Sequence, residues 1–165
     1  MAMEAGAAFY VKQNQTYILK LVGDIRYTMG CTLGDFLDDL FAHGDCDDII
    51  VDLTDTQSID STSLGLLAKI ANFSRQRFAR RTTLLSTHPD VNQVLDNLGF
   101  YDIFNIRDTG EAITAALREL AIQPPAKEQL TRIVFEAHRA LSELNPRNQE
   151  AFRSVLDSLR PKLGE

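Results

Sequence analysis

The fold depends on one stretch of the sequence, Val51-Asp-Leu-Thr-Asp-Thr-Gln-Ser-Ile-Asp-Ser-Thr-Ser-Leu-Gly-Leu-Leu67. It begins within an apolar run, residues 48–53, that suits a buried strand. It then passes through a polar loop to a helix that begins at Asp60-Ser61-Thr62-Ser63. Proteins built from alternating strands and helices place ligand-facing groups at such junctions. The free N–H groups and the positive dipole end of the helix favour an anion, so a phosphate on Ser61 would be stabilised there. The same Asp-Ser-Thr-Ser run is also an ordinary capping cluster, and alone it favours that simpler interpretation.

Outside this stretch, the apolar residues switch between a period of two and a helical period. The pattern predicts an opening strand hairpin followed by strands alternating with helices, which indicates an α/β fold with a mixed sheet. The expected strands are residues 9–12, 16–22, 48–53, 82–86 and 101–106, and the expected helices are residues 32–41, 63–78, 90–98 and 111–120. Thr32 is the expected N-cap of the first helix, and Gly44 is expected to end it.

A double proline, Pro124-Pro125, divides the chain into residues 1–122 and a helical C-terminal extension, residues 123–165, because the residue before a proline avoids the helical conformation. Two apolar stripes with helical spacing flank Asn145-Pro146, which is typical of an N-cap followed by proline. The stripes are Leu130, Val134, Ala137, Leu141 and Leu144, then Phe152, Leu156, Leu159 and Leu163. This hairpin either packs on its own domain or forms an arm for dimerisation or partner binding, and the sequence favours neither.

Composition restricts the class of protein. The 165 residues are 44% hydrophobic and 24% charged, as in an ordinary globular domain, and the net charge of −6 argues against nucleic acid as a partner. Cys31 and Cys46 match neither a disulfide framework nor a metal site, which favours a reducing compartment. The sequence has no recognisable secretory signal and no apolar window long enough to span a membrane. We therefore expect a cytoplasmic protein without membrane insertion.

Sequence motifs of enzymes are missing. The chain has no phosphate-binding loop, no dinucleotide fingerprint and no nucleophile elbow. His43, His88 and His138 are isolated in the sequence from one another and from cysteines or carboxylates at metal-ligand spacing. The sequence therefore predicts no enzyme activity, no cofactor and no metal site.

Charge is unevenly distributed along the chain. Residues 27–68 contain nine acidic residues and no lysine or arginine, whereas residues 69–81 contain five basic residues and no acid. We expect a polarised surface with a negative side around Ser61. Phosphate charge added there would meet like charges and shift any charge-sensitive interface.

Several motifs occur in the order of one known family. The stretch Ser58-Ile-Asp-Ser-Thr-Ser-Leu-Gly65 resembles the serine motif of STAS-domain anti-sigma factor antagonists. Residues 49–53 resemble the central strand of that family, Val22-Gly-Asp-Ile25 its early turn, and residues 91–104 its late helix and final strand. The resemblance covers roughly residues 9–120. Ser63 stands where the family often has glycine.

The resemblance implies a four- to five-stranded mixed sheet with helices mainly on one face. Ser61 would be phosphorylated by an anti-sigma factor with serine kinase activity, and a metal-dependent serine phosphatase would reverse the modification. The unphosphorylated domain would bind the anti-sigma factor, and the phosphorylated domain would release it. The expected partner-binding residues are Asp24, Asp60, Ser61, Thr62, Ser63, Leu64 and Gly65.

Other interpretations stay open at this point. Thr56, Ser58 and Thr62 are alternative phosphate acceptors. The chain could also be a non-phosphorylated STAS scaffold, an accessory of a signalling or transport complex, with the helical extension as its docking element and a possible homodimer contact. An enzyme or small-molecule binder on the same fold is the least favoured, since the sequence offers no nucleophile paired with a base.

Overall fold

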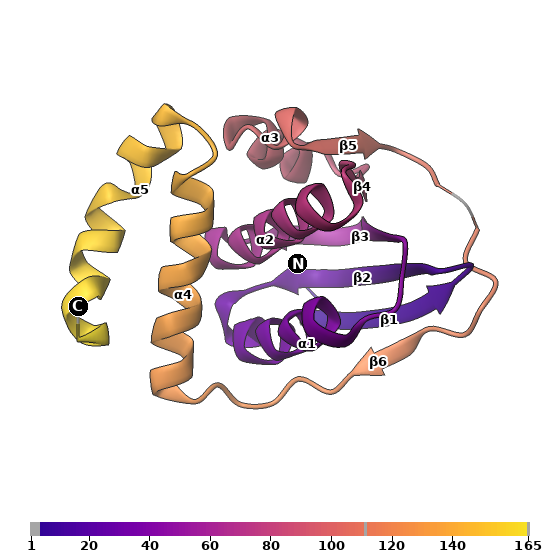
Figure 1. The fold of residues 1–165 in the computed structure, drawn as a ribbon, viewed down its shortest axis with the longest axis horizontal. Helices are drawn as coiled ribbons and strands as arrows, with labels where there is room; N and C mark the ends of the chain where they lie inside the picture. Colours follow the sequence, from indigo (N-terminus) through magenta and orange to yellow (C-terminus); the bar gives the residue numbers. More distant parts are fainter. Residues whose placement is uncertain (1–3, 111, 165) are drawn as a thin grey trace.

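Six strands form one mixed sheet in the computed structural model, which describes residues 4–110 and 112–164 (Figure 1). The strand order is β5-β4-β3-β2-β1-β6. The strands are β1 (Ala7–Gln13), β2 (Thr16–Ile25), β3 (Asp48–Ile59), β4 (Thr82–Leu85), β5 (Phe104–Arg107) and β6 (Arg118–Leu120). The helices are α1 (Gly30–His43), α2 (Ser61–Phe78), α3 (Pro89–Asn97), α4 (Lys127–Ser142) and α5 (Pro146–Leu159), with short 3-10 helices η1 (Tyr27–Met29), η2 (Phe100–Asp102) and η3 (Arg160–Leu163).

The opening hairpin sets the order of the sheet. Asn14 and Gln15 both adopt positive φ angles, of 51° and 64°, in the two-residue turn between antiparallel β1 and β2. This left-handed turn matches the twist of the paired strands. Strands β2, β3, β4 and β5 then run parallel to one another, with helices as the connections. The predicted α/β fold with a mixed sheet is confirmed.

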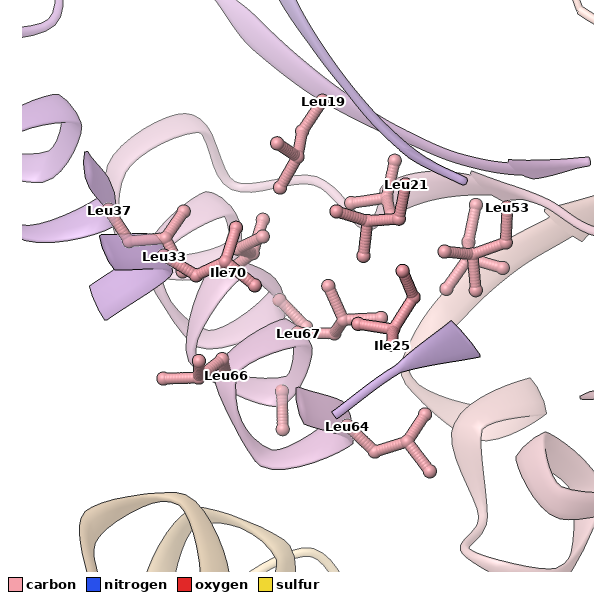
Figure 2. Close-up of a cluster of buried hydrophobic side chains, with 14 of the residues drawn as sticks. Leu19, Leu21, Ile25, Leu33, Leu37, Leu53, Leu64, Leu66, Leu67 and Ile70 are labelled. Atoms are coloured by element: carbon pink, nitrogen blue, oxygen red, sulfur yellow. The ribbon is translucent and has the colours of Figure 1, made fainter. Parts of the chain in front are cut away.

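The core lies between the sheet and the helices. Leu19 and Leu21 of β2 face Leu67 and Ile70 of α2, with Leu37 of α1 beside them (Figure 2). These side chains are nearly excluded from solvent. Burial of a large aliphatic side chain contributes roughly 1.5–3 kcal/mol, so this layer holds α2, and with it the start of α2, in a fixed position on the sheet.

The predicted helix over residues 111–120 is wrong for the part that the structure describes, and Glu111 itself lies outside the described residues. Residues 118–120 form β6, which pairs antiparallel with β1 and gives the sheet one strand more than the family resemblance implied. The open edge of β1 offers backbone hydrogen-bonding groups, and the Arg118 guanidinium lies 5.8 Å from the ring centre of Tyr10. Pairing with an existing edge outweighs the weak helical preference of so short a segment.

Three other elements differ from the prediction. Strand β3 continues to Ile59, so the polar loop expected after residue 53 is wrong, because these residues pair with the end of β2. Helix α1 begins at Gly30 after N-cap Met29, so Thr32 is not the N-cap and its hydroxyl instead accepts a hydrogen bond from the Gln123 N–H at 2.9 Å. Part of the expected strand 101–106 is the 3-10 helix η2. Gly44 ends α1 as predicted.

The C-terminal extension forms the two predicted helices, and Asn145 caps α5 ahead of Pro146. Helix α4 crosses the ends of α1 and α2, and α5 lies on its outer side (Figure 1). Ile133, Ala140 and Leu141 of α4 belong to the main core cluster. The hairpin thus packs on its own domain, the first of the two alternatives. The division of the chain near residue 122 stays a prediction, as does a homodimer contact.

Across residues 4–110 and 112–164, no helix is both long and apolar enough to cross a bilayer.

Candidate functional site

The side chain of Asp60 fixes the junction between β3 and α2. One carboxylate oxygen accepts a hydrogen bond from the Ser63 N–H at 2.9 Å, which caps α2. The other accepts from the Tyr27 N–H at 2.6 Å. One carboxylate therefore satisfies an otherwise unpaired helix N–H and holds the turn after β2 against the start of α2.

Asp24 lies beside this junction on β2. Gly23 has a φ of +85°, and the register between β2 and β3 shifts at this point, which turns the strand end toward Ile59 and Asp60. A Cβ at Gly23 would also lie 2.7 Å from the carbonyl oxygen of Ala5, so no other residue fits easily. This irregularity brings the predicted site residues Asp24 and Asp60 to the same end of the sheet.

The Asp24 carboxylate is paired on both oxygens. It accepts a hydrogen bond from the Ser58 hydroxyl and one from Arg26 Nε at 2.7 Å. The Ser58 hydrogen bond and then the Arg26 guanidinium favour the ionised form, and together they hold the pKa of Asp24 below its ordinary value of 3.8.

Replacing Ser58 with alanine is expected to raise the pKa of Asp24 toward 3.8, because the first of these causes is removed. In the native protein, the stabilising contribution of Asp24 is present above pH 3.8 and is lost as the pH falls through the lowered pKa. The titration of the Asp24 carboxyl carbon by NMR measures both values. An unchanged midpoint in Ser58→Ala would mean that Arg26 alone sets the pKa.

Ser61, the predicted phosphate acceptor, is the first residue of α2 and is half-buried. Its hydroxyl lies 2.9 Å from Nε2 of His138 in α4. The other ring nitrogen of His138, Nδ1, lies 2.7 Å from the Val134 carbonyl oxygen, which can only accept. A neutral His138 therefore carries its hydrogen on Nδ1, and its Nε2 accepts a hydrogen bond from the Ser61 hydroxyl.

Sequence reasoning missed His138, which it treated as isolated. The ring is only 6% exposed and lies 5.4 Å, centre to centre, from Phe152 of α5. The contact joins residues 77 positions apart and depends on how α4 crosses α2. The spacing of residues along the chain does not indicate this contact between Ser61 and His138.

The other predicted partner-binding residues are buried in this structure. Thr62, Ser63, Leu64 and Gly65 are all nearly excluded from solvent. At Gly65 the backbones of two helices meet, since a Cβ there would lie 2.2 Å from the carbonyl oxygen of Ala137 in α4. The roles of these four residues in partner binding stay predictions.

An exposed ridge remains beside the site. It consists of Arg26, Tyr27, Thr28 and Gln57, and Tyr27 is 45% exposed. Arg26 adds a positive charge next to Asp24 and Asp60, so this part of the surface is mixed in charge rather than uniformly negative. A partner can reach this ridge while α4 is in place.

The alternative acceptors are less accessible than Ser61 or already engaged. Thr56 is 1% exposed and donates its hydroxyl to the Leu21 carbonyl oxygen at 2.8 Å. Thr62 is 5% exposed, and the Ser58 hydroxyl donates to Asp24. Thr56 and Thr62 are thus less accessible than Ser61, whereas Ser58 and Ser61 are both half-buried and hydrogen-bonded. The choice of Ser61 as the acceptor stays a prediction.

The STAS domain family model matches residues 9–113 of the chain. The chain belongs to the STAS domain family. No curated protein matches the chain. The matched residues include most of β1, all of β2 to β5, the Asp60 cap and Ser61, whereas α4 and α5 lie beyond them. STAS domains are found generally in the superfamily of anti-sigma factor antagonists, whose members are generally not enzymes.

Proposed function

We propose that this STAS protein is an anti-sigma factor antagonist of a bacterial partner-switching cascade, controlled by phosphorylation of Ser61. The observation that carries the proposal is the position of Ser61 at the first turn of α2, next to the Asp60 cap and the exposed ridge of Arg26, Tyr27, Thr28 and Gln57. The unphosphorylated protein binds an anti-sigma factor with serine kinase activity in the cytoplasm. A serine phosphatase restores this form.

Phosphorylation changes the charge of the site, and the partner kinase, not this chain, catalyses it. The kinase transfers the γ-phosphoryl group of ATP to Ser61 Oγ. The Oγ–P bond forms, the bond to the bridging oxygen breaks, ADP leaves and the hydroxyl proton passes to a base of the kinase. The product adds about −1.5 to −2 charges close to Asp24 and Asp60. A partner that desolvates this surface then has to bury the added negative charge and is released.

A second candidate is a non-phosphorylated STAS scaffold. The specific observation in its favour is the hydrogen bond between the Ser61 hydroxyl and His138, which engages the acceptor within the chain. In that case Ser61 is a structural residue, and the α4–α5 hairpin or the exposed ridge is the docking element.

Partner capture from native cell extract separates the two candidates. We expect wild-type protein and Ser61→Ala to capture an ATP-binding anti-sigma kinase, identified by mass spectrometry, and Ser61→Asp to capture at least tenfold less, a change of about 1.4 kcal/mol or more. Thr109→Asp is the matched control, because Thr109 is exposed on the loop after β5 and receives the same charge. Equal capture of one partner by all four proteins would support the scaffold.

A further inference from the structure

The α4–α5 hairpin lies against the proposed phosphorylation site, and His138 of α4 contacts the Ser61 hydroxyl directly. We propose that docking of α4 on α2 and phosphorylation of Ser61 exclude each other, so that the hairpin is an intramolecular cover released by the phosphate. That a kinase supplies this phosphate in the cell rests on the proposed function. The mutual exclusion of α4 docking and a phosphate on Ser61 is a property of this chain alone.

The first argument is steric. Ser61 Oγ and His138 Nε2 lie at hydrogen-bond distance, 2.9 Å, with only a proton between them. A phosphoryl group on Oγ brings a tetrahedral phosphorus and three further oxygens into this space. The imidazole ring is held in this position, because Nδ1 donates to the Val134 carbonyl oxygen and the ring packs on Phe152.

The second argument concerns the proton. The Val134 carbonyl oxygen accepts a hydrogen bond from Nδ1–H of His138. The other ring nitrogen, Nε2, of the neutral ring therefore presents a lone pair to Ser61. The Ser61 hydroxyl supplies the hydrogen of this bond, and a phosphorylated Ser61 no longer has it. The contact therefore recognises the unphosphorylated form of Ser61.

The third argument is that α4 cannot slide sideways to make room. One turn along α2 from Ser61, the Gly65 backbone is in close contact with the Ala137 backbone. On the other side, the Ile133 side chain of α4 packs against Gly34 of α1. A Cβ at Gly34 would lie 2.6 Å from Ile133 Cδ1. The backbone contact at Gly65 thus fixes the position of α4 on α2, and a group inserted at Ser61 has to separate the two helices.

The polar contacts at the edge of this interface are compatible with release. Lys69 Nζ lies 3.3 Å from Glu136 Oε2, and Gln129 Nε2 donates to Asp35 Oδ1 at 2.8 Å. Such partly exposed contacts contribute little each, about 0–1 kcal/mol. The buried residues of α4 favour the docked state, so the hairpin opens as a discrete step and not by gradual loosening.

Two consequences follow for the switch. Lifting of α4 frees the Ser61 hydroxyl from His138 for the kinase, and the phosphate then keeps α4 from returning. Release also uncovers Thr62 and Gly65 on α2 together with the apolar side of α4. The phosphorylated protein therefore presents a surface that the unphosphorylated protein hides.

Hydrogen–deuterium exchange of the full-length protein tests the exclusion. Phosphoserine is inserted at position 61 during translation, which needs no knowledge of the kinase. We expect the amides of α4 around His138 to exchange at least about tenfold faster than in unmodified protein, since their opening free energy falls. The amides of β3 serve as the internal reference for the folded sheet. Phosphoserine inserted in place of the exposed Thr109 is the matched control and leaves α4 protected.

Unchanged protection of α4 in the phosphoserine-61 protein would overturn the inference, and so would increased protection, which would mean that a protonated His138 binds the phosphate. Ser61→Asp is measured alongside, and we expect the same α4 amides to exchange faster in this variant. If the phosphoserine-61 protein loses protection throughout the sheet, Ser61→Asp still tests the exclusion. The partner-capture experiment is independent of this result. Failure of one therefore does not imply failure of the other.

Discussion

Replacing Gly65 with alanine is expected to lower the free energy of unfolding by about 1–3 kcal/mol, even though alanine favours a helix over glycine by about 1 kcal/mol. The new Cβ would lie 2.2 Å from the Ala137 carbonyl oxygen and 2.6 Å from the Ala137 Cα. Both are backbone atoms of α4, which cannot move without shifting the whole helix. Urea denaturation measures the loss, and hydrogen–deuterium exchange should place it in α4.

Gly34→Ala is the matched control for this variant. Gly34 is also a helical glycine that faces α4, but its added Cβ would meet the Cδ1 atom of Ile133, the far end of a flexible side chain. Ile133 can change rotamer, and the gain in helix propensity offsets the cost, so we expect a change within about 1 kcal/mol. Equal destabilisation by both substitutions would contradict the assignment of Gly65 as the backbone contact that seats α4.

The capping of α2 could be predicted because its determinants are local. Asp60 bonds the N–H group of Ser63, three residues further on, and such a contact is visible in the order of residue types. Strand β4, most of β2 and the first half of β3 were also predictable, since their apolar runs are continuous. The second half of β3, residues 54–59, is polar and was expected to be a loop. The same reasoning located Ser61 at the start of a helix, and the family match is consistent with it.

The environment of Ser61 could not be predicted, because it depends on tertiary packing. The hydrogen bond to His138 exists only because α4 crosses α2 at Gly65 and Ala137. Small residues permit a close crossing, but the sequence does not say which two helices meet. The C-terminal helices were therefore predictable as helices, whereas their position over the candidate site was not.

The helix predicted over residues 111–120 is wrong for a similar reason, because tertiary contacts decide the structure of this segment. Ala115, Ala116 and Leu117 suit a helix on propensity. The Gln13 side chain at the end of β1 instead accepts hydrogen bonds from the N–H groups of Thr114 and Ala115, at 2.8 and 3.0 Å. These long-range contacts lead the chain along β1 to the pairing that forms β6. Local preference of a few tenths of a kcal/mol per residue is easily overridden by such contacts.

Replacing Leu141 with alanine is expected to lower the free energy of unfolding by about 2–5 kcal/mol, the largest effect of any substitution considered for this protein. The Leu141 side chain is 0% exposed and belongs to the same core cluster as the side chains of β2, β3 and α2. Its carbonyl oxygen also accepts a hydrogen bond from Asn148 at 3.1 Å, which ties the start of α5 to α4. Because one core spans the sheet and α4, urea denaturation should still give a single transition at a lower midpoint.

Leu117→Ala is the matched control, since it removes the same atoms from a side chain that is 36% exposed. We expect a change within about 0.5 kcal/mol for this surface position. A loss below about 1 kcal/mol for Leu141→Ala, or a separate early transition that leaves the β3 amides protected, would show that the extension folds apart from the sheet. The boundary near residue 122 would then be a true domain boundary. A single transition with a large loss would instead mean that the cover over Ser61 is held by the core of the protein, so that its release needs an input as strong as a phosphate charge.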